Sequence, residues 1–219
     1  MISDLAVAAA CRWPQPLFLW FLRKTTGTQI TPRQLQLIAR TVQSRPGCNL
    51  LIFGLGYDSV YWQRLNRAGH TLFLEDDDAW IGVVLSETPG LNVERVTYET
   101  RLRDWRELTS RTEDLILALP EAIAQRPWDV IVVDAPAGWS DDSPGRMQSI
   151  YTASRLCRPG GTVFVHDCER DAEAFWCDHV FGPALFEQEI PGPRKHGWLR
   201  QYRSASGDPN QSTPHRIKG

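Results

Sequence analysis

Lysine is scarce in this 219-residue chain, where only Lys24, Lys195 and Lys218 occur and arginine carries nearly all the positive charge. The formal net charge is -2, so the basic excess typical of nucleic-acid-binding proteins is missing. We therefore expect no nucleic-acid partner. Arginine offers a planar fork for carboxylates or phosphates, although a GC-rich genome is the more ordinary explanation of the bias.

A cysteine framework is also missing. The chain has five cysteines and no C-x-x-C spacing, and they are Cys11, Cys48, Cys157, Cys168 and Cys177. An odd number argues against a complete disulfide framework, and this spacing disfavours a zinc site. We expect reduced thiols in a cytosol-like compartment.

Long apolar runs are missing as well. The apolar cluster at residues 17–22 is far shorter than the ~20 residues that span a bilayer. No basic segment opens the chain, which disfavours a signal peptide. The sequence therefore predicts a cytoplasmic protein without a transmembrane segment. Residues 1–45 are expected to form a helical N-terminal segment or lid.

The stretch at residues 49–58 reads Asn-Leu-Leu-Ile-Phe-Gly-Leu-Gly-Tyr-Asp. Its unbroken apolar run is typical of a strand buried on both faces of a parallel sheet. Gly54 and Gly56 follow, where a missing Cβ permits a tight turn and close approach to a ligand. With a helix expected from near Ser59, this loop lies where open α/β sheets bind nucleotide-like ligands. A plain strand–turn–helix is the alternative, because the third glycine of the dinucleotide fingerprint is absent.

A second strand is expected at residues 71–74, followed by the acids Glu75, Asp76, Asp77 and Asp78. A carboxylate at this strand end can accept both hydroxyls of a ribose, which suits Glu75. Asp77 or Asp78 also suits the start of a helix, where acids complement the helix dipole. The separation of Gly54 from Glu75 is close to the ~20 residues typical of nucleotide-binding units, which favours the nucleotide interpretation.

The rest of the chain continues this alternation. We expect further strands at residues 92–98, 129–133, 162–165, 185–190 and 198–202, and helical segments at residues 100–126, from Ser143 and at 172–180. The pattern predicts an α/β fold with a doubly wound, mostly parallel sheet flanked by helices. One domain is expected at residues 46–203, followed by a polar, disordered tail at residues 204–219.

Polar residues follow two later strands of this predicted sheet. Asp134 comes directly after the strand at residues 129–133, and His166 and Asp167 follow the strand at 162–165. The carboxyl ends of parallel strands share one edge, so we expect these side chains near the glycine loop and Glu75. Alternatively, His166 holds a loop and Asp167 caps the next helix.

Several motifs together resemble one family. They are Gly-Leu-Gly-Tyr-Asp-Ser at residues 54–59, Asp-Ala-Pro at 134–136, Pro-Gly-Arg-Met at 144–147 and Val-His-Asp at 165–167. Over about residues 46–202 the chain resembles the glucuronoxylan 4-O-methyltransferase family of plants, also called the irregular-xylem or polysaccharide-biosynthesis family.

The resemblance implies a Rossmann-like class I S-adenosylmethionine methyltransferase. Gly54, Gly56 and Asp58 would cradle the methionine part of the cofactor, and Glu75 would hold its ribose. The cofactor site expected from the resemblance comprises Gly54, Gly56, Asp58, Ser59, Glu75 and Asp76. The implied reaction is methyl transfer to the 4-hydroxyl of a glucuronic acid residue, or to a related glycan or small molecule.

An alcohol is a poor nucleophile, so the reaction needs a base or a metal. One hypothesis makes Asp134 or His166 the general base. Another makes Asp134 and Asp167 the ligands of a divalent cation (Mg, Mn or Co), since carboxylates suit such ions. Arg146 is the candidate for binding the carboxylate of an acidic sugar, and Trp139 for stacking on its ring.

Two other classes of function remain open. A non-catalytic scaffold of polysaccharide biosynthesis would share the fold without needing the glycines, Glu75 and Asp134. A dinucleotide-dependent oxidoreductase would require a third glycine after Gly56, which the sequence lacks. Binding of S-adenosylmethionine would separate these classes.

Overall fold

The computed structural model describes Leu17, residues 30–193 and residues 197–205. The expected lid therefore falls largely outside the described residues, and so does the expected tail beyond Ala205. Among the described helices the longest, α3, has 12 residues. None has the ~20 apolar residues that a bilayer core requires.

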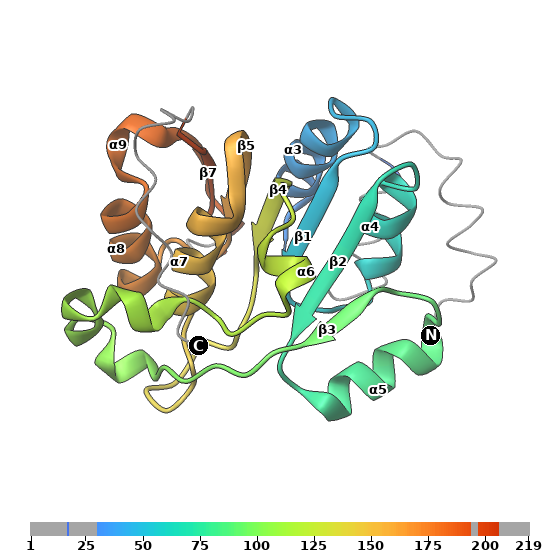
Figure 1. Ribbon diagram of the computed structural model, residues 1–219. Helices are drawn as coiled ribbons and strands as arrows, with labels where there is room; N and C mark the ends of the chain where they lie inside the picture. The colour runs from blue at the N-terminus through green and yellow to red at the C-terminus, as the bar shows by residue number, and fades with distance from the viewer. Residues whose placement is uncertain (1–16, 18–29, 194–196, 206–219) are drawn as a thin grey trace.

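A seven-stranded sheet crosses the molecule in the order β3-β2-β1-β4-β5-β7-β6 (Figure 1). The strands are β1 (Asn49–Phe53), β2 (His70–Glu75), β3 (Val93–Arg95), β4 (Trp128–Val133), β5 (Cys157–Val165), β6 (Phe186–Ile190) and β7 (Leu199–Arg203). The first five strands pair in parallel, and β7 pairs antiparallel with both β5 and β6. The predicted doubly wound, mostly parallel sheet is confirmed.

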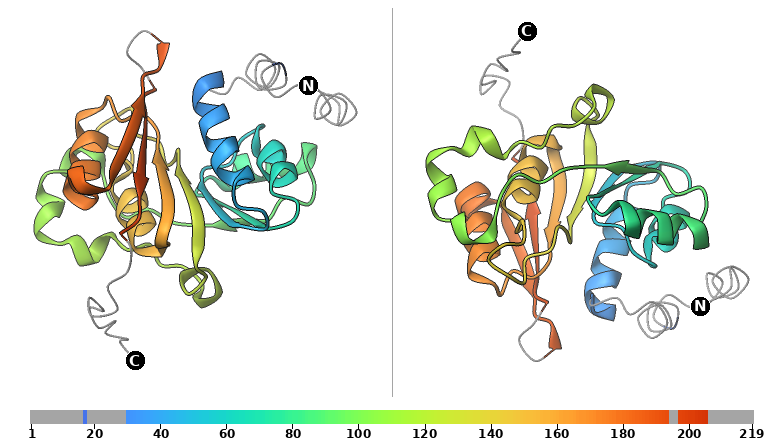
Figure 2. Two further views of the ribbon diagram at one scale, coloured as in Figure 1. Left: turned by 90° about the horizontal axis from the view of Figure 1, so that it is seen from above. Right: turned by 90° about the horizontal axis from the view of Figure 1, so that it is seen from below.

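Helices cover both faces of this sheet (Figure 2). They are α3 (Pro32–Gln43), α4 (Ser59–Leu65), α5 (Asp78–Glu87), α6 (Glu121–Ala124), α7 (Met147–Leu156), α8 (Asp171–Val180) and α9 (Gly182–Leu185). In β1, Leu50 and Ile52 point into the core beneath α3 and α4, whereas Leu51 and Phe53 point into the core beneath α7 and α8. This two-sided burial explains the unbroken apolar run in the sequence.

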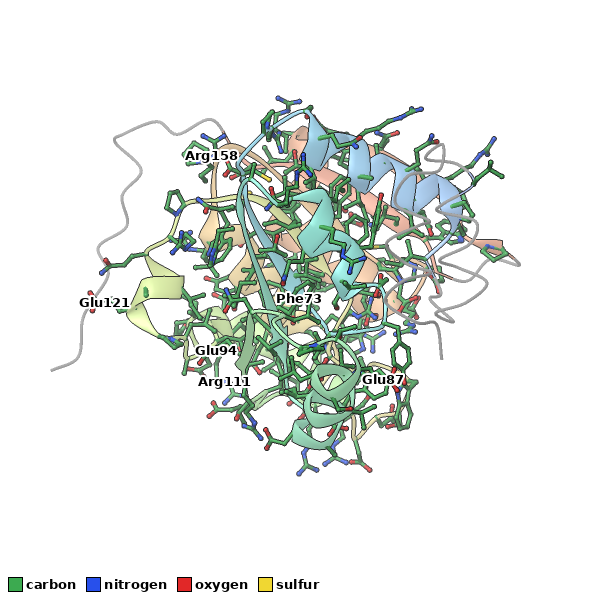
Figure 3. The ribbon with its side chains drawn as sticks, turned by 90° about the vertical axis from the view of Figure 1, so that its right-hand side faces the viewer. Phe73, Glu87, Glu94, Arg111, Glu121 and Arg158 are labelled. Atoms are coloured by element: carbon green, nitrogen blue, oxygen red, sulfur yellow. The ribbon has the colours of Figure 1, made fainter. Side chains whose placement is uncertain are left out.

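The interior of the sheet is predominantly apolar. Figure 3 shows Phe73 of β2 inside the molecule and Glu121 and Arg158 at its outside. Phe73 is 0% exposed. Burial of this kind supplies the main favourable free energy of folding, and it fixes the strand ends that carry the site.

Thr31 is the N-cap of α3, and Pro32 is its first residue. The Thr31 hydroxyl accepts the Gln34 amide (3.3 Å), and the Gln34 side chain accepts the Thr31 amide (2.7 Å), which completes a capping box. The buried Gln34 amide group also donates to the carbonyls of Ile190 (2.9 Å) and Gly197 (2.6 Å). These bonds tie α3 to the segment that connects β6 and β7.

The prediction of a largely helical stretch at residues 100–126 is wrong. The structure has three 3-10 turns there, η1 (Leu102–Asp104), η2 (Glu107–Ser110) and η3 (Thr112–Leu115), followed by the four-residue α6. Beside the short-range bonds of these turns, backbone amides in and next to this stretch donate to side chains of α7. Gln148 accepts the Glu99 amide (2.8 Å), and the Thr152 hydroxyl accepts the Leu117 amide (3.0 Å). Tertiary contacts here override helix propensity.

Two strand boundaries also differ from prediction. β3 is shorter than expected, because the chain leaves the sheet after the Val96 amide donates to the Glu75 carbonyl (2.9 Å). β5 begins at Cys157 instead of residue 162 and so includes the Pro-Gly-Gly sequence at residues 159–161. A register shift opposite Trp128 accommodates this early start.

Candidate active site

A cavity of about 580 Å³ opens at the carboxyl edge of the parallel strands. Its walls come from the loops that follow β1, β2, β4 and β5. The volume lies within the ~300–1,000 Å³ of small-molecule sites. Of the eleven residues of the predicted cofactor, catalytic and acceptor sites, all except His166 line this cavity. They are Gly54, Gly56, Asp58, Ser59, Glu75, Asp76, Asp134, Trp139, Arg146 and Asp167, and Arg170 and Trp80 line it as well.

The two glycines let the loop after β1 pack closely against Ala135 and Asp58. Gly54 has φ +116°, and a Cβ there would lie 3.2 Å from the Cβ of Ala135. A Cβ on Gly56 would lie 2.9 Å from a carboxylate oxygen of Asp58. Only glycine fits both positions without displacing a neighbour.

Asp58 and Ser59 stand at the start of α4, as predicted. The Ser59 hydroxyl accepts the Gly56 amide (2.9 Å), and the Asp58 carboxylate accepts the indole N–H of Trp62 (3.1 Å). Burial raises the pKa of Asp58 to about 6, and the charge of Asp134 adds to that rise. No cation of the described residues forms a salt bridge with Asp58.

Glu75 closes the other side of the glycine loop. Its carboxylate accepts the amides of Leu55 (3.0 Å), Asp76 (3.0 Å) and Asp77 (3.2 Å). Burial nevertheless raises its pKa. Asp77, and not Asp78, caps α5, because its carboxylate accepts the Trp80 amide (3.0 Å).

Trp80 is a wall of the cavity that the sequence analysis did not assign. Its indole N–H donates to the Leu55 carbonyl (2.7 Å), and its ring meets Tyr57 edge to face with 5.3 Å between centroids. The position of Trp80 in the first turn after an acidic strand end is the signal that could have suggested it.

Asp134, His166 and Asp167 meet as one cluster. His166 Nδ1 lies 3.0 Å from Asp134 Oδ1 and 3.3 Å from Asp167 Oδ1. Asp167 has φ 63°, a left-handed conformation that is uncommon outside glycine and that often marks functional sites. The Asp134 side chain is 34% exposed, whereas those of His166 and Asp167 are 1% and 5% exposed. Asp134 is therefore the member of the cluster that is most accessible from the cavity.

Opposite charges in this cluster shift the pKa values of Asp134 and His166. Burial alone would raise the pKa of Asp134, but the charge and hydrogen bond of His166 and the charge of Arg146 outweigh it and lower that pKa. Burial would likewise lower the pKa of His166, and the two aspartates outweigh it and raise that pKa. Asp134 is thus ionised at neutral pH.

Arg146 lies beneath the cluster and is only 6% exposed. Its guanidinium donates to the carbonyls of His166 (2.8 Å), Asp134 (2.7 Å) and Pro136 (3.4 Å). It also contacts the carboxylates of Asp134 (3.2 Å) and Asp167 (2.9 Å). The expectation that Arg146 binds an acceptor carboxylate does not suit this geometry, since the fork is engaged by the protein. The geometry favours a positioning role.

A second cavity of about 930 Å³ adjoins the first. The two cavities share Gly138, Trp139, Asp167 and Arg170. Trp139, the residue expected to stack on a sugar, is 80% exposed at this shared rim, and its stacking role stays a prediction. Arg170 was not assigned from the sequence, although its place three residues after Asp167 at a helix start is a usable signal.

The sheet order and the position of the cavity define the fold of class I S-adenosylmethionine-dependent methyltransferases. An S-adenosylmethionine-dependent O-methyltransferase from Thermotoga maritima has this fold, with a TM-score of 0.52 and 14% identity. The likeness covers 94% of this chain and 74% of that one. At this identity the likeness establishes the fold.

The family is shown by the sequence comparisons. The model for the family IRX15/IRX15L/GXM matches residues 33–117 and 113–184, and the chain belongs to this family. Glucuronoxylan 4-O-methyltransferase 2 of Arabidopsis thaliana is 38% identical over 212 residues, which cover 83% of this chain and 71% of that protein. Arabinogalactan O-methyltransferase 2 of the same plant is 34% identical over 165 residues, 64% of this chain and 57% of that protein. The resemblance found in the sequence is confirmed.

Proposed function

We propose that this protein is an S-adenosylmethionine-dependent O-methyltransferase that methylates the 4-hydroxyl of a glucuronic acid residue in a glycan. The observation that carries the proposal is that one cavity is lined both by the glycine loop with Glu75 and by Asp134 and Asp167. The names of the relatives, which are methyltransferases of glucuronoxylan and arabinogalactan, support this class of acceptor.

The residues present fit the proposed cofactor. Glu75 is a buried carboxylate at the end of β2, where it can accept ribose hydroxyls. Asp58 is a desolvated carboxylate with no salt-bridge partner among the described residues. The ammonium of the methionine part would supply the missing positive charge. Gly54 and Gly56 have no Cβ, so a ligand can approach the backbone of their loop closely.

When bound, S-adenosylmethionine supplies a methyl group whose bond to sulfur breaks as its bond to the acceptor oxygen forms, leaving S-adenosylhomocysteine. The protein has to align the acceptor and remove its proton. Asp134 is the group for that proton, because it is ionised and faces the cavity. Positive charge grows on the attacking oxygen and makes its hydrogen strongly acidic, so even a carboxylate of low pKa accepts the proton.

We propose a divalent cation as a further component of the same cluster. One ligand atom from each of Asp134, His166 and Asp167 lies within 4.8 Å of the others. Two carboxylates and an imidazole fit such an ion, and the imidazole favours Co²⁺ or Mn²⁺ over Mg²⁺. A cation there would polarise the acceptor hydroxyl as a Lewis acid. His166 Nδ1 lies between the two carboxylates, and a cation held by this cluster would require an unprotonated ring nitrogen of His166.

Calorimetric titration with S-adenosylhomocysteine tests the proposal. We expect the wild type to bind it and Glu75→Ala to bind it at least tenfold more weakly, about 1.4 kcal/mol. Glu75→Gln keeps an acceptor for the loop amides and should retain the fold by circular dichroism. The exposed Glu121→Ala is the matched control. Absence of binding to the wild type would refute the methyltransferase and favour a non-catalytic scaffold.

The pH dependence of this binding is a second prediction. Only ionised Asp58 pairs with the ligand ammonium, and its pKa in the free protein is about 6. Affinity should therefore be constant above about pH 7 and fall about tenfold by pH 5, where roughly a tenth of the groups are ionised. Asp58→Asn should bind weakly with no slope over this range. An equal slope in wild type and Asp58→Asn would assign the titration to another group.

A further inference from the structure

The second cavity holds an arginine that the reaction described so far does not use. Arg170 lies on the wall shared by both cavities, and its side chain is 33% exposed. Its guanidinium contacts Asp167 Oδ2 (2.9 Å) and donates to the Gly138 carbonyl (3.3 Å). It differs in this from Arg146, which is 6% exposed and surrounded by acceptors of the protein.

Arg200, another arginine of the second cavity, is paired with acids of the protein. Arg200 contacts the carboxylates of Glu189 (2.7 Å) and Asp178 (3.1 Å), and its side chain is 18% exposed. It belongs to the second cavity alone, whereas Arg170 also reaches the first. Arg170 is therefore the guanidinium that an anion lying between the two cavities would meet.

The covalent structure of a glucuronic acid residue places strict demands on its site. Its carboxyl group is attached to C5, directly beside C4, whose hydroxyl would receive the methyl group. A cation for the carboxylate must therefore stand next to the group that takes the hydroxyl proton. Arg170 meets this demand, because Asp167 bridges it to His166 and His166 contacts Asp134.

Arg170 is also held firmly from behind. A Cβ on Gly138 would lie 3.2 Å from Arg170 Nη1 and 2.9 Å from a carboxylate oxygen of Glu173. Glu173 is 1% exposed and lies 3.9 Å from Arg170 Nη1. The glycine at position 138 thus leaves room for a guanidinium that is fixed on one side by acids and open on the other.

We propose that Arg170 binds the carboxylate of the acceptor and so selects a uronic acid over a neutral sugar. The rest of the glycan then occupies the second cavity, between Trp139 and Trp198 at its rim. This inference rests on the proposed function and adds the residue that sets its acceptor class. Arginine suits the role, because its fork pairs with both oxygens of a carboxylate.

Acceptor selectivity tests this proposal. The probes are a xylo-oligosaccharide bearing one glucuronic acid and the same oligosaccharide with that carboxyl group reduced to an alcohol. In the wild type we expect kcat/KM to be about 10- to 100-fold higher for the acid, the gain expected from a charge-assisted hydrogen bond. Arg170→Gln should lose this preference by slowing only the acidic acceptor, and Arg170→Lys should recover part of it.

The controls separate this proposal from failure of the proposed function. Arg203→Gln removes an arginine that is also paired with an acid, Glu187, but lines neither cavity. It should keep the selectivity, and every variant should bind S-adenosylhomocysteine within about twofold of the wild type. Equal loss on both acceptors in Arg170→Gln, or a wild type that does not prefer the acid, would overturn the role of Arg170 while leaving the methyltransferase intact.

The same probes can be titrated into the complex with S-adenosylhomocysteine, so that the result does not depend on turnover. Tighter binding of the acidic oligosaccharide by the wild type, lost in Arg170→Gln, would support the proposal. Equal affinity for the two oligosaccharides would refute it. A wild type that binds no S-adenosylhomocysteine would refute the proposed function, and the acceptor site with it.

Discussion

Asp134→Asn is expected to lower kcat by about 10²- to 10⁴-fold, the usual contribution of a positioned acid or base. The asparagine has nearly the same shape but cannot take the hydroxyl proton. Asp134 is the exposed member of its cluster, with 34% of its side chain accessible, so the acceptor would meet it first. Methyl transfer to a glucuronic-acid-bearing oligosaccharide measures the effect, and the Kd for S-adenosylhomocysteine should change less than about threefold.

Asp142→Asn is the matched control for this variant. Asp142 is an exposed aspartate paired with Arg103 (2.7 Å), and it lines neither cavity. Its replacement should leave kcat within about twofold of the wild type. If Asp134→Asn retained wild-type kcat, the assignment of Asp134 as the proton acceptor would be wrong, and His166 would be the next candidate.

The same variant separates the two hypotheses for the cluster. If a cation contributes, a chelator should abolish wild-type activity and added Mn²⁺ or Co²⁺ should restore it. Asp134→Asn would then need a higher concentration of the ion, because a neutral amide oxygen is a weaker ligand than a carboxylate. If Asp134 acts only as a base, chelation should leave the wild-type rate unchanged.

Arg146→Met is expected to lower the free energy of unfolding by about 3–5 kcal/mol, the cost of leaving a buried ion pair without one partner. Arg146 is the buried cation in contact with both Asp134 and Asp167, and it satisfies three backbone carbonyls as well. In a chain of this size the loss corresponds to a fall in Tm of roughly 6–20 °C. Thermal and urea unfolding followed by circular dichroism measure it.

Two comparisons make this prediction specific. Arg146→Lys keeps a charge but cannot reach all these acceptors, so it should fall between Arg146→Met and the wild type. Arg95→Met removes an exposed arginine paired with Asp78 (3.3 Å) and should cost at most about 1 kcal/mol. Stability of Arg146→Met equal to that of Arg95→Met would show that the buried charges are neutralised by other means, such as proton uptake by an aspartate.

The sequence by itself determined the sheet and the edge at which the site lies. Apolar runs such as residues 50–53 have to be buried on both faces, and glycines directly after them permit only a narrow set of turns. Because parallel strands bring their carboxyl ends together, Glu75 and Asp134 were expected at one edge, and both line the cavity. These inferences are local, since each depends on a few consecutive residues and on one rule of sheet geometry.

Only the tertiary structure decided how the side chains divide the work at that edge. The sequence suggested that Arg146 was a free fork for an acceptor, but the fold wraps carbonyls of residues 10 to 20 positions away around it. The same folding left Arg170 open between two cavities. Whether an arginine is engaged or available depends on the path of distant loops, and no local pattern of residues encodes that path.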